Sequence, residues 1–147
     1  MMIAACNFTH APEILAILNE AIVNSTALYD YKPRTMAAME GWFEAKKRGG
    51  YPILGAFEED GAFAGFASYG AFRAWPAYKY SVEHSVYVQK ENRGRGLGKM
   101  LLGALIVAAK HQEYHMMIGG IDSSNSAIIM IKDWLEIYIS FILLCMI

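Results

Sequence analysis

Apolar residues in the first fifty positions recur at the spacing of two amphipathic helices that follow one short strand. Residues 2–7 are mostly apolar and predict an edge strand. Thr9 predicts the cap of a first helix, which carries apolar residues at helical spacing and ends near position 24. Thr35 predicts the cap of a second helix, which ends at the three basic residues and two glycines of positions 46–50.

The middle of the chain changes to strand-like patterns. Residues 53–58 and 62–68 are apolar runs separated by the turn sequence Glu-Asp-Gly, so we expect a β-hairpin. An aromatic-rich loop over residues 70–79 then leads to another alternating segment over residues 80–88. This segment predicts a third strand of the same sheet.

The remaining elements complete a mixed α/β or α+β fold. A glycine-rich loop precedes a helix over residues 97–110, whose apolar face includes Met100. A strand over residues 116–121 and a turn at 122–125 follow, and we expect a last helix to start near residue 126. Strands and helices in this order predict a mixed sheet flanked by helices.

Composition narrows the class of protein. The chain has 147 residues and a net charge of −1, which suits one globular domain and disfavours a nucleic-acid binder. Its apolar runs are shorter than the roughly 18 residues of a membrane span, and it starts without a basic stretch and an apolar signal core. Cys6 and Cys145 stand alone, without metal-type spacing. We therefore expect a cytoplasmic protein that uses no membrane, nucleic acid or metal.

The loop after residue 88 contains the chain's most distinctive chemistry. Residues 92–99 read NRGRGLGK, in which three glycines alternate with two arginines and a lysine. A P-loop would need glycine at Arg93 and Ser or Thr at Met100. The dinucleotide fingerprint would need its third glycine at Lys99 or Leu101. Neither spacing fits, which weakens the hypothesis of an unrelated nucleotide-binding module.

The spacing that remains is Arg93-x-x-Gly96-x-Gly98 between a strand and a helix. Bare backbone amides and the positive end of the helix converge at such a loop, which favours phosphate. The alternative is a flexible loop that is basic by chance.

Several motifs together resemble one known family. VYV at residues 86–88, the segment QKENRGRGLGKMLL and a later strand and turn containing Asn are similar to the acetyl-CoA site of the GNAT superfamily of N-acetyltransferases. EHSVYV at residues 83–88, NSTALYDYKPRT and SYGAFRAWPAYKY resemble its phosphinothricin and methionine sulfoximine acetyltransferases. The resemblance implies a GNAT-like mixed sheet and acetyl-CoA-dependent N-acetylation of a small amine. The expected acceptor is an amino acid or an analogue such as phosphinothricin, methionine sulfoximine or methionine sulfone. It also implies a homodimer and no metal.

The same resemblance implies which residues bind acetyl-CoA. The pantetheine arm and acetyl group would lie in a gap between two parallel strands. The residues implied along this part are Val86, Tyr87, Val88 and Asn125. The residues implied at the pyrophosphate are Arg93, Gly94, Arg95, Gly96, Leu97, Gly98 and Lys99.

Glu83 is the general base that the resemblance implies. An amine must lose its proton before it attacks the acetyl group, and Glu83 lies among apolar strand residues that could desolvate its carboxylate. Without the family, a carboxylate on the polar face of a strand explains Glu83 equally simply. His84 would face the opposite side of the strand, either near the substrate or in a structural role.

The acceptor pocket is expected at the aromatic loop. Arg73 could pair with a substrate carboxylate. Trp75 and Tyr29 could form walls, although packing in the core or at a dimer interface explains aromatic residues too. Glu83, His84 and Ser85 complete the expected substrate-binding residues.

The C-terminus departs from the family. The resemblance covers residues 1–127, a predicted N-acetyltransferase domain, whereas 128–147 form a divergent tail in place of the family's last helix and two strands. Codons for residues 132–135, AAR GAY TGG YTN, give Lys or Arg, Ile or Thr, then Gly when read one nucleotide later, close to the family sequence. We hypothesise a frameshifted remainder, which could mimic a lost strand or extend a helix.

Two missing strands would leave an apolar sheet edge open, so low stability and self-association are expected. The alternative function is a truncated, inactive protein that still binds coenzyme A.

Overall fold

The computed structural model describes residues 1–25, 32–122 and 140–146; for residues 121–122 and 140–146, only the backbone is considered. The main elements are β1 (Met2–Ala5), α1 (Ala11–Asn24), α2 (Met36–Gly49), β2 (Ile53–Phe57), β3 (Phe63–Ala71), β4 (Ser81–Val88), α3 (Leu97–His111), β5 (Met116–Asp122) and β6 (Ser140–Met146).

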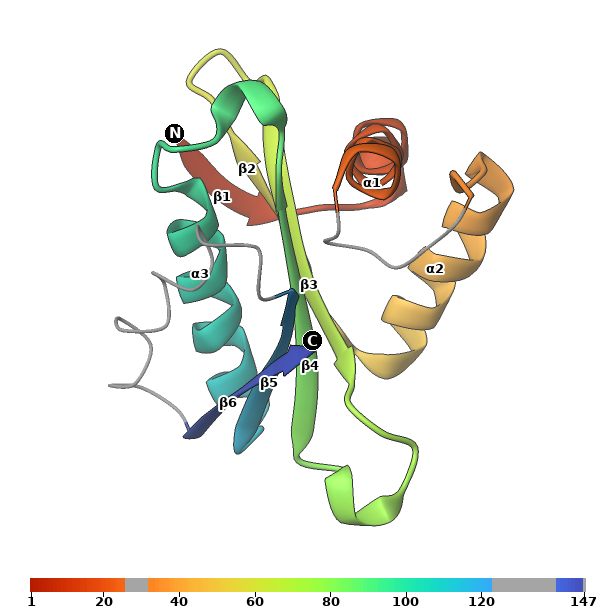
Figure 1. Cartoon of the computed structure of the whole chain (residues 1–147), viewed down its shortest axis with the longest axis vertical. Coiled ribbons are helices and arrows are strands. Elements are labelled where there is room, and N and C mark those ends of the chain that lie inside the picture. Colours follow the sequence, from red (N-terminus) through yellow and green to blue (C-terminus); the bar gives the residue numbers. More distant parts are fainter. Residues whose placement is uncertain (26–31, 123–139, 147) are drawn as a thin grey trace.

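The strands form one mixed sheet in the order β1-β2-β3-β4-β5-β6. The pairs from β1 to β4 are antiparallel, whereas β4–β5 and β5–β6 are parallel. Helices α1 and α2 cover one face and α3 covers the other (Figure 1). The mixed sheet flanked by helices that the sequence predicts is therefore confirmed.

Side chains of the central strands alternate between two apolar clusters. Phe66 of β3 and Tyr87 of β4 pack with α1 and α2. Ala67 of β3 and Val86 of β4, each one residue away, pack against α3. This alternation follows the two-residue period of a strand and defines which residues share the face of α1 and α2.

The prediction that Thr9 caps α1 is wrong. A short 3-10 turn over Phe8–His10 precedes α1, and the Asn7 side chain accepts a hydrogen bond from the Thr9 backbone N–H at 2.9 Å. His10 therefore stands at the start of α1, without a side-chain cap. The predicted cap of α2 is confirmed, because Thr35 Oγ1 accepts a hydrogen bond from the Ala38 N–H at 3.3 Å.

Two further expectations need correction. Strand β3 extends to Ala71, two residues into the expected aromatic loop, because Gly70 and Ala71 pair with β4. Met100 is 43% exposed, so it lies outside the buried face of α3. Leu101 and Leu105, which the same pattern predicts on that face, are fully buried there. The predicted face is therefore confirmed at these two leucines and wrong at Met100.

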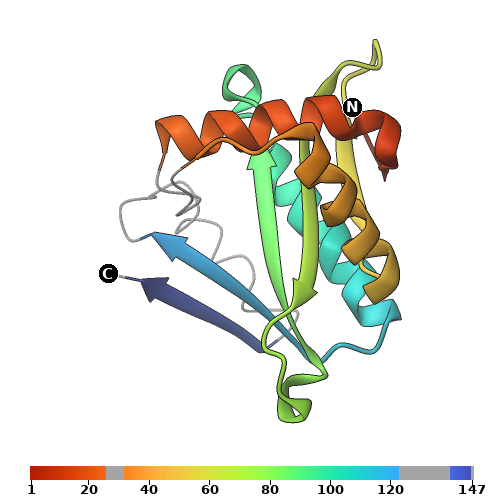
Figure 2. The ribbon, with the colours of Figure 1, turned by 90° about the vertical axis from the view of Figure 1, so that its right-hand side faces the viewer.

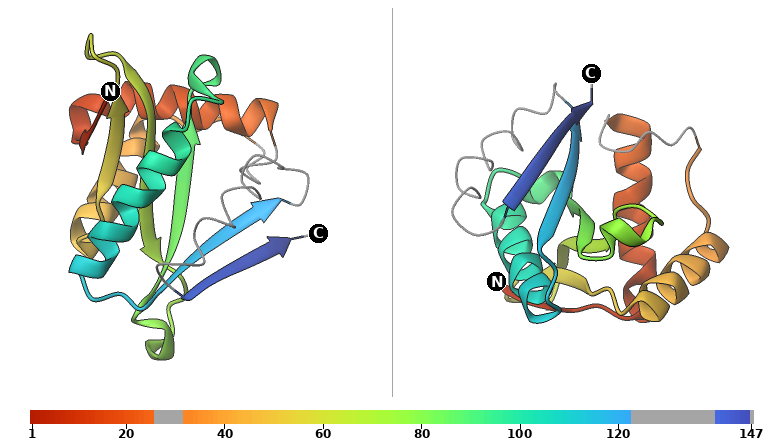
Figure 3. Two further views of the ribbon diagram at one scale, coloured as in Figure 1. Left: turned by 90° about the vertical axis from the view of Figure 1, so that its left-hand side faces the viewer. Right: turned by 90° about the horizontal axis from the view of Figure 1, so that it is seen from below.

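Part of the tail forms a strand. Residues 140–146 pair with β5 in parallel over its whole length and lie at the sheet edge remote from β1 (Figure 3). The tail thus adds one strand, as one of the two sequence hypotheses expected. The expected turn at 123–125 and helix from 126 lie outside the described residues. Across the part of the chain that is described, none of the helices combines the length and apolar character needed to cross a membrane.

Candidate active site

Strands β4 and β5 separate immediately after Glu83. Their pairing covers only three positions, the last of which joins Glu83 to Ile118. Beyond this point β3 stays paired with β4 as far as Val88, while β5 stays paired with β6. The edge of β4 over residues 84–88 therefore faces a widening gap, which Figure 2 shows between the two strands. We call this place the fork.

The far end of β4 leads into the glycine loop. Gly94 and Gly96 have φ angles of +77° and +81°, in the left-handed region that favours glycine. An added Cβ at either position would meet no atom within 4 Å, so the backbone angle rather than lack of space requires glycine there. The loop is thus shaped by its own dihedral angles and leaves room above its backbone.

The loop ends at the N-terminus of α3, which has the properties of an anion site. No side chain caps this end, and its first turn contains no acidic residue. The first N–H groups of a helix have no partners within the helix, and they carry its positive partial charge. Leu97 is 1% exposed and packs in the core, so only its backbone belongs to this surface. An open glycine backbone that leads into the N-terminus of a helix fits a pyrophosphate.

Both loop arginines pair with carboxylates of other elements. Arg93 Nη2 lies 2.8 Å from Glu20 Oε2 of α1, and its Nε donates to the Val88 carbonyl at 3.1 Å. Arg95 Nη1 lies 2.5 Å from Glu58 Oε1, just after β2. The guanidinium groups therefore hold the loop between α1 and the β2–β3 hairpin. To bind phosphate, each would have to exchange its partner.

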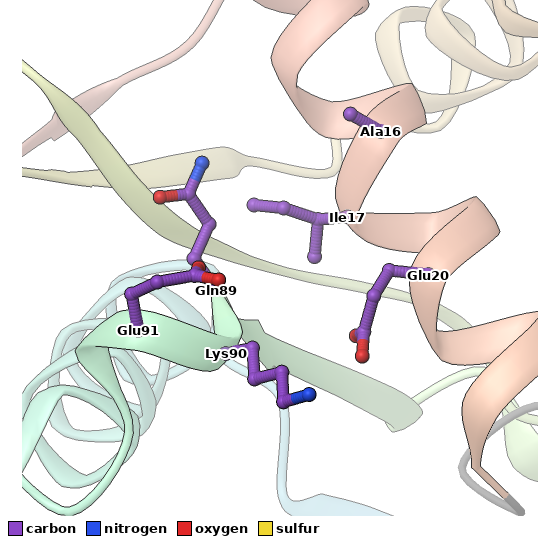
Figure 4. A pocket seen from close by; sticks show the side chains of 6 residues that line it. All are labelled: Ala16, Ile17, Glu20, Gln89, Lys90 and Glu91. Atoms are coloured by element: carbon purple, nitrogen blue, oxygen red, sulfur yellow. The ribbon is translucent and has the colours of Figure 1, made fainter.

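Two hollows border the loop. One, of about 230 Å³, lies between α1 and the start of the loop, where Glu20 and Lys90 extend into the space (Figure 4). The other, of about 510 Å³, is lined by Glu58, Glu59, Asp60 and Arg95. Three carboxylates against one guanidinium make the second hollow unfavourable for a pyrophosphate.

Glu83 stands at the fork with an exposed side chain. A Cβ added to Gly120 of β5 would lie 3.3 Å from Glu83 Oε1, so the carboxylate reaches over β5 at this glycine. Glu83 shares its sheet face with Tyr87, but it lies beyond the cluster that α1 and α2 cover.

His84 occupies the opposite face of β4, as expected. It lies two residues from Val82 and from Val86, on the face of β4 that packs with α3. Burial lowers the pKa of His84 to about 4, so the imidazole is neutral at pH 7. Its neutral ring is therefore directed away from the face that carries Glu83.

The other residues expected to bind the substrate are exposed wherever the structure describes them. Ser85 is exposed on the same face as Glu83. Arg73 lies in the loop between β3 and β4, where its guanidinium carbon stands 4.4 Å from the Phe72 ring centre. Trp75 of the same loop is 69% exposed. Tyr29 and Asn125 lie outside the described residues.

One inward-pointing cation was missed by sequence reasoning. Lys46 was taken as part of a basic helix end, but its Nζ donates to the Tyr69 carbonyl of β3 at 2.7 Å. The signal was present, because Lys46 continues the buried stripe of Met39 at a spacing of seven residues. Burial lowers the pKa of Lys46 to about 8. Among the described residues, no group of three or more His, Cys, Asp or Glu is arranged to hold a metal.

Comparison with known proteins agrees with this geometry. Residues 14–130 match the acetyltransferase (GNAT) family. An L-methionine sulfoximine/L-methionine sulfone acetyltransferase of Pseudomonas paraeruginosa is 47% identical over 79% of this chain and 67% of its own length.

Two solved structures have the same fold. An N-acetyltransferase from Staphylococcus aureus Mu50 is 46% identical, with a TM-score of 0.88 over 92% of this chain and 81% of its own. A GNAT superfamily phosphinothricin acetyltransferase from Sinorhizobium meliloti, in complex with acetyl-CoA, is 31% identical, with a TM-score of 0.87 over 91% of this chain and 72% of its own. The fork, the glycine loop and these likenesses together show that the chain belongs to the GNAT family of acetyltransferases.

Proposed function

We propose that this protein transfers the acetyl group of acetyl-CoA to the α-amine of a small amino acid analogue. Methionine sulfoximine and methionine sulfone are the first candidates, since a relative with 47% identity is named for them. Phosphinothricin is the next, because a relative of 31% identity is named for it. The observation that carries the proposal is the fork: β4 and β5 part at a carboxylate, and the free edge of β4 leads to the glycine loop.

Acetyl-CoA supplies the activated acetyl group. The backbone of residues 86–88 binds the pantetheine arm along the free edge of β4, and Asn125 binds near that arm. The amides of residues 94–99 bind the pyrophosphate at the start of α3. Arg93 and Arg95 strengthen this contact once they leave their carboxylate partners.

Glu83 removes the proton that an acceptor amine carries at neutral pH. Because its side chain is exposed, a water molecule can relay the proton between the amine and the carboxylate. Backbone N–H groups on the β4 edge stabilise the negative charge that develops on the acetyl oxygen. Tyr29, Arg73, Trp75 and Ser85 surround the acceptor, while His84 supports β4 from the opposite face.

We also propose that residues 1–127 form the catalytic domain and that 128–147 are a divergent remainder of it. We propose further that the protein is a cytoplasmic homodimer. Size-exclusion chromatography with light scattering measures the assembly, and a monodisperse dimer is the expected result. A monomer would contradict it.

The decisive test follows binding and chemistry separately. Coenzyme A is titrated while the melting temperature is measured, and release of its thiol is then assayed with methionine sulfone, methionine sulfoximine and phosphinothricin. We expect a rise in melting temperature and thiol release that depends on the acceptor. A rise without turnover would indicate an inactive protein that binds coenzyme A. If neither the melting temperature rose nor thiol was released, the proposal would be refuted.

A further inference from the structure

The ammonium of Lys46 is turned toward the sheet, unlike its basic neighbours. Besides its bond to the Tyr69 carbonyl, Nζ lies 5.4 Å from the Trp42 ring centre and 5.8 Å from that of Tyr51. Lys47 and Arg48, the next two residues of α2, are exposed. The aromatic rings and the carbonyl hold one cation in place at the end of α2.

This cation lies over the register partner of Glu83, on the face of the sheet that carries Glu83. A Cβ built on Gly70 of β3 would lie 3.4 Å from Lys46 Nζ. Gly70 is the register partner of Glu83 in the β3–β4 pair. Residues directly opposite in neighbouring strands project to the same face, with Cβ atoms about 5 Å apart. Because Gly70 has no side chain, it adds none between the ammonium and β4, while the Glu83 carboxylate extends toward Gly120 on the other side of β4.

Among the described residues, no carboxylate lies within ion-pair distance of Lys46. Its pKa is lowered to about 8 by burial, without a contribution from a neighbouring acid. A partly buried ammonium without a counter-charge is costly, and an anionic ligand beside it would offset that cost. Two of its three N–H donors remain after the bond to the Tyr69 carbonyl.

We propose that Lys46 binds the carboxylate of the acceptor amino acid and so directs the α-amine toward Glu83. This inference rests on the proposed function and makes Lys46 a specificity-determining residue for it. An α-amino acid carries both groups on one carbon, so a cation that reaches from α2 over β3 and a base on the neighbouring β4 match its two ends. Arg73, in contrast, lies on an exposed loop and stacks on Phe72.

The test compares two acceptors with two variants. Methionine sulfone and its carboxamide differ only in the carboxylate. Lys46→Met retains the apolar stem but removes the charge, and Lys47→Met is the matched control on the same helix. With Lys46→Met, we expect KM for the acid to rise tenfold or more, KM for the carboxamide to change less than twofold, and the response to coenzyme A to persist. Lys47→Met should resemble the wild type with both acceptors.

Equal losses for both acceptors would mean that Lys46 only supports the fold, and an unchanged KM for the acid would overturn the inference as well. Lys46→Arg, which retains the charge, should recover part of the preference for the acid if Lys46→Met folds poorly. Calorimetric binding of the two acceptors, with coenzyme A present, makes the same comparison without turnover. Absence of transfer would therefore count against the proposed function, whereas equal affinities for acid and carboxamide would count against the role of Lys46.

Discussion

The two ends of the fork are built in different ways. The proposed phosphate end is a contiguous loop, in which two glycines with positive φ lead directly into α3. The proposed acceptor end would be assembled from three elements, since Lys46 of α2 and Tyr69 of β3 are 23 residues apart and Glu83 comes from β4. A motif scan can detect the first kind of site, but only folding brings the second kind together. We therefore expect substitutions at the two ends to affect different steps.

The largest effect is expected from Glu83→Gln at the acceptor end. Loss of a general base typically lowers turnover by about 100-fold to 10,000-fold, and we expect kcat to fall in this range. Affinity for coenzyme A should remain within about twofold, because the substitution is remote from the glycine loop. Thiol-release kinetics and calorimetry measure the two quantities. If turnover fell less than tenfold, the proton would have to leave by another route.

The next effect concerns His84, on the opposite face of β4. Burial lowers its pKa from 6.5 to about 4, so between these values the unfolded chain binds more protons than the folded chain. Stability should therefore fall as the pH drops from 6.5 to 4, by up to about 3 kcal/mol, and this contribution should level off below pH 4.

Urea unfolding at a series of pH values measures the slope of stability against pH. His84→Phe should make it shallower, whereas a substitution of the exposed His111 should leave it unchanged. The same slope in wild type and His84→Phe would show that the imidazole is not desolvated in the folded protein.

Gly96→Ala tests whether the phosphate end depends on backbone angles. At φ +81° a Cβ costs about 1–2 kcal/mol, and a displaced loop should weaken coenzyme A binding about tenfold. Gly41→Ala is the control, because Gly41 lies inside α2 with open space around it and alanine there should stabilise by about 0.5–1 kcal/mol. Denaturant unfolding and calorimetry distinguish the two. Unchanged coenzyme A binding in Gly96→Ala would show that the affinity does not depend on the backbone angle at this position.

The smallest effect is expected from Glu58→Gln, which frees Arg95 for the cofactor. Exposed ion pairs contribute about 0–1 kcal/mol, so affinity for coenzyme A should rise about twofold to fivefold at low salt and less at high salt. Glu59→Gln should have a smaller effect, since the Glu59 side chain is 94% exposed and its charge is screened by solvent. A weaker affinity in Glu58→Gln would mean that the ion pair positions the loop.

Local sequence predicted the hairpin, the extent of α3 and the glycine loop, because turns, periodicity and positive-φ glycines act over a few residues. It failed where a competing local turn or packing with other elements decided the outcome. The cap at Thr9 was lost to a turn that Asn7 organises, Met100 was turned outward by the packing of α3, and β3 was lengthened by its pairing with β4. The ion pairs of Arg93 and Arg95 likewise join residues that are far apart in the chain.

The sequence by itself indicated the family from motifs of short spacing, and that resemblance implied a phosphate role for the glycine loop and Glu83 as the candidate base. Tertiary structure alone decided that Lys46 faces the sheet at Gly70, the register partner of Glu83, that Glu83 is exposed at the fork, and that residues 140–146 lie as a parallel edge strand. The physical reason is that burial, charge pairing and strand register are properties of neighbours in space, which a linear pattern does not specify.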